Sequence, residues 1–408
     1  MDVFDALTPL AAKRLRASAL DAYAQAYFDR LRVQGYAALT VRLYLNCLAH
    51  FALWSVRRRF DLTSFDRHAE CFVLQHLPRC SCAGPVQRTA HCVRAALKHF
   101  KAVIVDAGIV VAGPADPIDT VLQRFDGYLQ RIRGLAASTR RQRLAIIRPL
   151  ASMAGGCLPS PELVRSFLHQ QLSHLTPASA HVTTTAMRSW LRFLAFEGER
   201  VEQLLPLVAS PANWRLAPLP QTLTQPEIER LLDAFPTDLP SQLRCLAIMR
   251  CVVDLGLRSS EVIALEFDDI DWTAGTVRIG KAKSRRVDKL PLPQATGAAI
   301  AQYVRKERPC TTSSRRIFVR HVAPMDAPVT ASVVRRTVRE AYRRAGLPYT
   351  RVHILRHTLA SRLLNSGGTL KEVADVLRHR ELDTSLIYAK VDIAHLHAVA
   401  MPWPGSNA

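Results

Sequence analysis

The sequence predicts a mainly α-helical protein with one small antiparallel β-sheet in its C-terminal half. Apolar residues recur at helical spacing along most of the 408 residues, and 49% of the chain is hydrophobic, so a sizeable core can form. A glycine-centred pattern near residue 35 returns near residue 134, which indicates two helical modules in tandem. Residues 276–291 show a strand–turn–strand pattern that predicts the sheet.

The formal net charge of +21 indicates the class of partner. An excess of this size suits nucleic acid or an anionic membrane surface. The sequence has no run of 18 apolar residues, and its acidic start at Met1–Asp5 lacks the basic region of a secretory signal. Nine scattered cysteines are typical of reduced thiols in a cytosolic compartment. We therefore expect a soluble intracellular protein that contacts nucleic acid and no membrane.

Residues 1–113 are predicted to form the first helical module. Residues 1–19 look like a short leader with a basic end, and the helical pattern runs from Asp21 to about Gly108. Thr40 is expected to open one of the helices, because a threonine before an apolar helical pattern is a common first residue.

Residues 117–210 are predicted to form a second module that repeats the first. Gly134 matches Gly35, and Thr139 matches Thr40, each at an offset of 99 (134 − 35 and 139 − 40). Two unrelated four-helix modules can look alike, but the shared offset favours a true repeat.

A cluster of arginines is expected to contact DNA from the second module. Ser138 is predicted to cap the N-terminus of a helix, and Arg140, Arg141 and Arg143 follow it directly. Cations at a helix N-terminus, together with its free backbone N–H groups, suit phosphate contact.

The first module holds extra residues that carry histidines and cysteines. Met187 matches Val93 at an offset of only 94 (187 − 93), so the first copy has about five additional residues (99 − 94). The spacing Cys-x-Cys is tighter than that of the usual structural zinc site, so a loop with buried or free thiols is the favoured interpretation, and neither a metal nor a cofactor is predicted. The residues concerned are His76, Cys80 and Cys82, with His68, Cys71, His91 and Cys92 nearby.

Residues 221–408 are predicted to form a third domain after a proline-rich linker at 206–220. Thr224 begins its first helix, with Pro226 in the first turn and Glu227 placed to complete a capping box. Such a linker would let two domains close around a duplex.

Four polar side chains lie close together in the sequence near the C-terminus. His353 and Arg356 are three residues apart, so they share one face of a helix, and His379 and Tyr388 follow. Taken singly, each is typical of a structural residue. Together they offer hydrogen-bond donors for a phosphate beside a hydroxyl that can attack it.

These residues resemble the signature of the tyrosine recombinase (phage integrase) family, over about residues 221–392. The family's upstream arginine has a match in Arg258, within Gly-Leu-Arg-Ser-Ser-Glu, and its hairpin lysine has a match in Lys281. One position departs: Arg378 stands where members often have glycine. The second module resembles the core-binding domain that precedes the catalytic domain, and the first resembles a duplicate of it or an additional arm.

The resemblance implies a division of roles among the polar side chains. Tyr388 would attack phosphorus, the two arginines would hold the charged transition state, and Lys281 would protonate the leaving 5′-oxygen, with Lys283 as the alternative. Glu261 would orient a neighbouring group, and no metal is required. The implied catalytic residues are Arg258, Lys281, His353, Arg356, His379 and Tyr388, and the implied DNA contacts include Lys283 and Arg285.

Two further stretches have competing interpretations. The acidic run at 268–271 could suggest a two-metal site, but its place before a strand favours a solvated loop. The tail at 391–404 is apolar at helical spacing, so it is expected to bury in its own core or in a neighbouring protomer.

The resemblance implies a site-specific DNA recombinase, an integrase or transposase of a mobile element. It would work as a homotetramer on paired sites of double-stranded DNA, with possible accessory recombinases, in the cytoplasm of a bacterium. A type IB topoisomerase would use the same chemistry without strand exchange, and a DNA-binding subunit without activity is the alternative from another class. The filled set of catalytic positions argues against the inactive subunit.

Overall fold

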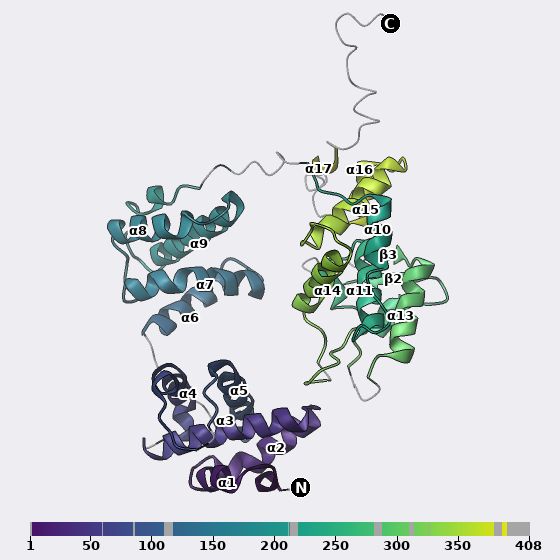
Figure 1. The fold of residues 1–408 in the computed structure, drawn as a ribbon. Coiled ribbons are helices and arrows are strands. Elements are labelled where there is room, and N and C mark those ends of the chain that lie inside the picture. The colour runs from purple at the N-terminus through teal and green to yellow at the C-terminus, as the bar shows by residue number, and fades with distance from the viewer. Residues whose placement is uncertain are drawn as a thin grey trace, which may run out of the picture. The chain divides into compact units, whose positions relative to one another are not determined.

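The computed structural model describes residues 2–58, 60–84, 86–109, 117–210, 212, 219–280, 288–309, 314–325, 327–378 and 386–389. The chain divides into two compact units, Met1–Arg32 with Ala37–Trp214 and Val33–Tyr36 with Arg215–Ala408. Helices dominate both, and the named strands of the described residues form one antiparallel sheet in the second unit (Figure 1). The predicted fold class is confirmed. Among these residues, no helix has both the length and the apolar character needed to cross a membrane.

The first helical module has an aromatic core. Phe51 is fully buried, and its ring lies 5.3 Å from Phe72, while Tyr27 meets Phe100 edge to face at 5.6 Å. The expected leader at 1–19 is wrong, because Leu15 is fully buried on a helix that packs against α3. The helices are α1 (Pro9–Arg16), α2 (Ala24–Val33), α3 (Ala38–Val56), α4 (Phe65–Cys71) and α5 (Ala90–Asp106), with a π-helical turn at Phe72–His76.

Two helices begin earlier than the sequence predicted. The helix expected to open at Thr40 begins at Ala38, and the N-cap position expected at Ser138 is taken by Ala136. In both cases a glycine with positive φ precedes the helix, Gly35 at 76° and Gly134 at 59°. The glycine completes the turn early, so the hydroxyl residue falls inside the first helical turn. The two turns remain 99 residues apart (134 − 35).

The second helical module packs around Trp190. This fully buried ring meets Phe125 at 5.0 Å and Phe193 at 5.3 Å. The core draws apolar residues from four helices, α6 (Pro117–Arg131), α7 (Ala137–Met153), α8 (Pro161–Leu172) and α9 (Pro177–Phe196). The domain boundaries 1–113, 117–210 and 221–408 remain predictions.

The second unit is organised around helix α11, which contacts α13, α14 and α15. The predicted opening at Thr224 is confirmed: its backbone N–H donates to Glu227 at 2.8 Å, and Pro226 lies in the first turn. The helices that build this core are α10 (Gln225–Leu232), α11 (Gln242–Leu255), α12 (Ser259–Val262), α13 (Gln294–Lys306) and α14 (Ala331–Arg344).

The predicted hairpin is present as part of a three-stranded antiparallel sheet in the order β1-β2-β3. Val277 lies opposite Ile270 on one side and Leu290 on the other, and these three side chains are buried in the core. The segment that joins β2 to β3 contains Lys281, Lys283 and Arg285, and it lies outside the described residues. The strands are β1 (Ile270–Asp271), β2 (Thr276–Ile279) and β3 (Asp288–Pro291).

The acidic run at 268–271 is a 3-10 turn followed by strand β1, so the expected solvated loop is wrong in its local structure. Asp268 pairs with Arg315 at 2.5 Å, and Asp269 lies 3.7 Å from Arg278. Each of these two carboxylates therefore lies beside an arginine.

Three C-terminal helices enclose a small apolar cluster. Leu364 and Ala360 meet Val373, Leu377 and the ring of Tyr388 there. The helices are α15 (His353–Asn365), α16 (Leu370–Val376) and α17 (Leu386–Ala389). His379 and the tail at 391–404 lie outside the described residues.

Candidate active site

The site begins at the end of helix α11. Gly256 caps that helix with φ of 58°, a left-handed conformation that glycine adopts without a steric penalty. A Cβ atom at this position would lie 2.8 Å from Leu359 Cδ2 and 3.1 Å from Leu377 Cδ2. The chain therefore turns tightly against α15 and reaches Arg258, the N-cap residue of the short helix α12.

Arg356 is held rigidly in the first turns of α15. Its side chain is buried, with the residue 5% exposed, and Nη1 donates to the carbonyl of Gly256 at 2.6 Å. Nη2 donates to the carbonyl of Leu377. Burial, followed by repulsion from Arg258 and Arg378, lowers the pKa of Arg356 to about 9. The guanidinium is thus positive at neutral pH and fixed between two chain segments that are distant in sequence.

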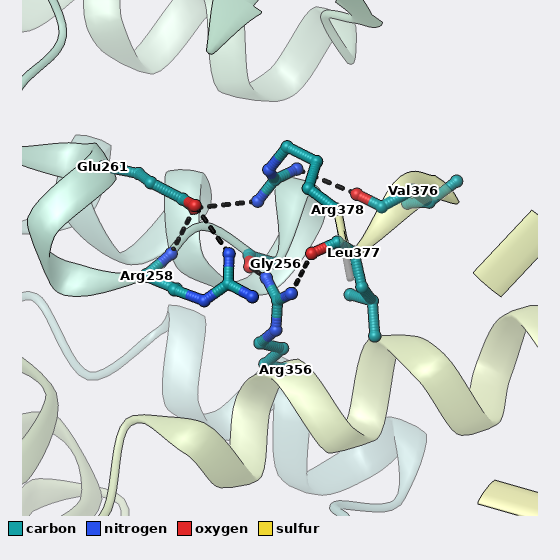
Figure 2. Close-up of polar contacts among 7 residues, drawn as sticks. All are labelled: Gly256, Arg258, Glu261, Arg356, Val376, Leu377 and Arg378. Carbon is teal, nitrogen blue, oxygen red and sulfur yellow. Dashed lines mark hydrogen bonds and ion pairs between the residues drawn. The ribbon is translucent and has the colours of Figure 1, made fainter. Parts of the chain in front are cut away.

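Glu261 of α12 joins Arg258, which precedes α12, to Arg378, which follows α16 (Figure 2). One carboxylate oxygen pairs with Arg258 Nη1 at 2.7 Å, and the other pairs with Arg378 Nη2 at 2.8 Å. The carboxylate is nearly inaccessible, and although burial opposes ionisation, Arg378 and Arg258 lower the pKa of Glu261. The expectation that Glu261 orients a neighbouring group agrees with this geometry.

The structure shows how an arginine is accommodated at position 378, where family members often have glycine. Its φ of 55° is left-handed, the conformation that glycine would adopt most easily. The side chain folds back, donates to the carbonyl of Val376 at 2.8 Å and reaches Glu261. Sequence reasoning missed this contact, because Arg378 and Glu261 are 117 residues apart.

Two histidines of α15 lie beside the arginines. His353 is exposed at the first residue of the helix, yet neighbouring protein atoms desolvate its ring and, together with Arg356 and Arg258, lower its pKa below 6.5. His357 is half-buried one turn later, and burial followed by the charges of His353 and Arg356 lowers its pKa as well. Both imidazoles are therefore mainly neutral at neutral pH.

The hydroxyl of Tyr388 meets His357. The Tyr388 oxygen lies 2.9 Å from His357 Nδ1, and the ring is 2% exposed within the small apolar cluster. Burial raises the pKa of Tyr388, while the charges of Arg356 and Arg258 act in the opposite direction. Sequence reasoning missed His357, although its place four residues after His353 on the same helix face was a usable signal.

The structure brings four of the six expected catalytic residues into one neighbourhood. Arg258, His353, Arg356 and Tyr388 influence one another's charge. The other two, Lys281 and His379, lie outside the described residues.

The arginines expected to contact DNA occupy the first turns of α7 in the other unit. Arg141 is exposed, whereas Arg140 pairs with Asp126 at 2.9 Å and Arg143 donates to Ser189 at 2.6 Å. Burial and the charges of Arg133 and Arg192 lower the pKa of Arg143. The first turns of α7 are thus basic. Arg140 and Arg143 are held by other side chains, whereas Arg141 is exposed.

Comparison with known proteins agrees with this geometry. The model of the phage integrase family matches residues 221–395. Two putative integrase/recombinase proteins from Sinorhizobium fredii are similar along nearly the whole chain: y4rA is 33% identical, covering 91% of this chain and 91% of the relative, and y4rF is 31% identical, covering 97% and 94%. A solved structure of XerH site-specific recombinase bound to its palindromic difH substrate has a TM-score of 0.55 at 16% identity, covering 70% of this chain and 97% of that one.

Identity of this level over nearly the full length shows common descent, and the structural likeness shows a common fold. The chain therefore belongs to the phage integrase family, and it is a site-specific tyrosine recombinase, an enzyme that breaks and rejoins DNA.

Proposed function

We propose that Tyr388 is the nucleophile of this recombinase and forms a 3′-phosphotyrosyl bond with one DNA strand at each of two sites. A phenol suits this step, because its phosphate ester keeps the energy of the broken bond and a sugar hydroxyl can attack it in turn. The observation that carries the proposal is the gathering of Arg258, Arg356 and two neutral histidines near one buried tyrosine hydroxyl.

In this proposal the two arginines stabilise the transition state. Negative charge grows on the non-bridging phosphate oxygens, and a guanidinium offers planar paired donors that match them. Arg356 is fixed by two carbonyls and Arg258 by Glu261, so little reorganisation is needed at the moment of reaction. Loss of one such preorganised donor typically costs about 3–4 kcal/mol of barrier.

Two histidines compete for the phenol proton. His353 is one candidate acceptor, and His357, whose Nδ1 lies 2.9 Å from the Tyr388 oxygen, is the other. A neutral imidazole beside a protonated phenol is the arrangement that a general base requires. We assign the proton to His357, while His353 and His379 donate hydrogen bonds to the phosphate.

The leaving 5′-oxygen needs a proton, and Lys281 is assigned as the general acid. The lysine would come from the segment between β2 and β3, whose flanking strands are held in register by the core. Lys283 remains the alternative donor, and Lys283 and Arg285 are assigned as phosphate contacts.

We further propose that the active assembly is a homotetramer on two double-stranded DNA sites. Each protomer would present one tyrosine, so exchange of both strands at two sites calls for four. The exposed Arg141 and its neighbours on α7 would contact the phosphate backbone. The DNA sites that the enzyme recognises determine whether it carries out integration, excision or transposition. They also determine whether an accessory recombinase takes part.

A substrate with sulfur at the bridging 5′ position tests the assigned roles. A thiolate leaves without protonation, so Lys281→Ala should cleave this substrate but not the normal one. Tyr388→Phe should stay inactive on both while binding DNA normally, because only the nucleophilic oxygen is lost. Arg258→Ala and Arg356→Ala should recover much less, since their partners are the unchanged non-bridging oxygens.

Lys283→Ala is the matched control in that experiment. Rescue of Lys283→Ala instead of Lys281→Ala would move the general acid by two residues. Absence of rescue in both variants would reject a lysine general acid. A covalent complex that still forms with Tyr388→Phe would reject the nucleophile and, with it, the proposed mechanism.

A further inference from the structure

Four potential metal ligands converge in the first helical module, and none of them is among the residues assigned to recombination. They are His50, His76, Cys80 and Cys82, and their ligand atoms all lie within 4.8 Å of one another. His50 comes from the middle of α3, His76 from the π-helical turn, and the two cysteines from the loop that leads to α5. His50 was not noticed in the sequence, because 25 residues separate it from His76 (76 − 50 − 1).

We propose that these four side chains bind one structural Zn²⁺ ion. Tetrahedral bonds of about 2.0–2.1 Å to nitrogen and about 2.3 Å to sulfur place two nitrogens about 3.3 Å apart and a nitrogen and a sulfur about 3.6 Å apart. The Nε2 atoms of His50 and His76 are 3.3 Å apart. Cys80 Sγ lies 3.4 Å from His50 Nε2, and Cys82 Sγ lies 3.6 Å from His76 Nε2.

The hydrogen bond of His50 fixes which nitrogen faces the cluster. Nδ1 lies 2.9 Å from the carbonyl oxygen of Gln87, which can only accept, so Nδ1 carries the proton. Nε2 therefore presents its lone pair to His76 and Cys80. A backbone carbonyl that orients the far nitrogen of a histidine in this way is a usual feature of metal-binding histidines. His50 is itself 1% exposed, so this lone pair is not available to bulk water.

Hydrogen bonds alone explain the close approach of these four side chains less well than a bound metal ion does. If His76 Nε2 donates its proton to His50 Nε2, the same nitrogen cannot accept from the thiol of Cys82. A bound cation removes this conflict, because both histidine nitrogens and both sulfurs then act as electron-pair donors. Two thiolates and two neutral imidazoles also match the charge of one Zn²⁺ ion and the ligands it prefers.

The tight Cys-x-Cys spacing fits the site once the backbone is considered. Cys80 has an extended conformation, with φ of −68° and ψ of 117°. Residues two apart in an extended chain point to the same side, so Cys80 and Cys82 can reach one ion without the knuckle of a Cys-x2–4-Cys motif. The sequence argued against zinc because Cys-x-Cys is too tight for the usual knuckle. That argument does not apply here, because the extended geometry needs no knuckle.

Neighbouring contacts hold the cysteine loop in place. Arg14 of α1 donates to the carbonyl of Ala83. Gly84 follows with φ of 74°, and a Cβ atom there would lie 2.8 Å from Leu10 Cδ2. These contacts anchor the loop directly after Cys82.

The first test is the metal content of the full chain, purified under reducing conditions with zinc supplied. We expect about one zinc ion per chain in the wild type and almost none in a Cys80→Ser/Cys82→Ser variant. Cys71→Ser and Cys92→Ser are matched controls, because they remove other thiols of the same module and should leave zinc unchanged. Zinc absent from the wild type, or retained by the double variant, would overturn the proposal.

A second measurement keeps the test valid if the double variant folds poorly. A strong chelator applied to the wild type should expose two additional reactive thiols and lower the melting temperature of the first module. Re-addition of zinc, but not of magnesium, should reverse both changes, since Mg²⁺ prefers oxygen ligands. If thiol reactivity does not change on chelation, the cluster consists of free thiols only, and the zinc site is rejected.

The two proposals fail separately in these experiments. Metal content and thiol reactivity report on the first module alone, whereas cleavage of the sulfur-containing substrate reports on the site in the second unit. A zinc-free protein that still forms the phosphotyrosyl bond would reject only the zinc site.

Discussion

At the scale of single residues, Arg378 acts on the proposed phosphate site through its ion pair with Glu261. Its left-handed backbone costs about 1–2 kcal/mol relative to glycine, whereas breaking a buried ion pair costs about 3–5 kcal/mol. The second quantity is larger, so Arg378→Gly should lower the free energy of unfolding by about 2 kcal/mol despite the relief of strain. It should also slow cleavage, because Glu261 then loses one of the two arginines that fix its position.

A double-mutant cycle with Glu261→Gln measures this coupling. Chemical denaturation of the two single variants and the double variant should show strong non-additivity, because both substitutions remove the same ion pair. Additive effects on stability would mean that Arg378 acts through its backbone conformation alone.

The pH profile of cleavage distinguishes the two candidate proton acceptors. Burial lowers the pKa of His357, so the neutral form that can accept the Tyr388 proton persists as the pH falls to 6.5, and the rate should drop only at more acidic pH. His357→Asn places a non-titrating oxygen near the position of Nδ1 and should flatten this acid limb. His353→Asn is the matched control and should keep it. The opposite pattern would return the role to His353.

Residues such as these show how far the sequence could predict the site. Arg258, His353, Arg356 and Tyr388 could be proposed from the sequence because each lies in a short local pattern with a chemical meaning. His357 and Arg378 were missed because their roles depend on contacts across the fold. The ion pair to Glu261 has no local signal in the sequence, whereas the 2.9 Å contact of His357 to Tyr388 had only one, the place of His357 four residues after His353.

At the scale of elements, the end of α11 positions the site. Gly256→Ala should destabilise the protein and reduce cleavage, because the added Cβ atom meets Leu359 and Leu377 and displaces the carbonyl that Arg356 binds. Gly346→Ala is the control: its φ of 66° is also left-handed, but nothing lies within 4 Å of the added atom. The control should show only the backbone cost of about 1–2 kcal/mol.

Thermal unfolding and single-turnover cleavage of both glycine variants check this prediction. Equal losses of stability, with cleavage unaffected in both, would show that the turn at Gly256 does not position Arg356.

Helix boundaries show what the sequence could not predict at this scale. The capping residues of α10 were predicted correctly, because Thr224 and Glu227 satisfy each other locally. The start of α7 was predicted two residues too late, because a left-handed glycine ended the preceding turn before Ser138. A hydroxyl residue marks a helix start only when no earlier residue has completed the turn.

At the scale of the whole molecule, the charge of +21 sets how DNA binding responds to salt. Each phosphate neutralised by a lysine or arginine contributes about −0.9 to the slope of log affinity against log salt concentration. If at least six phosphates are contacted, the slope should be about −5 or steeper. Measurements of affinity by fluorescence anisotropy at several salt concentrations give this value directly, and a slope near zero would exclude phosphate contacts as the main source of affinity.

The contacts of the arginines of α7 predict how much each of them contributes to the slope of log affinity against log salt concentration. Arg141 is exposed, so Arg141→Ala should make the slope less steep by about 0.9. Arg140 already pairs with Asp126 and must leave that carboxylate to reach a phosphate, so Arg140→Ala should change the slope less. Arg165→Ala is a control, because this exposed arginine lies on α8, outside the proposed surface, and 3.7 Å from Glu162. An Arg165 effect as large as that of Arg141 would show that net charge, rather than the α7 surface, governs binding.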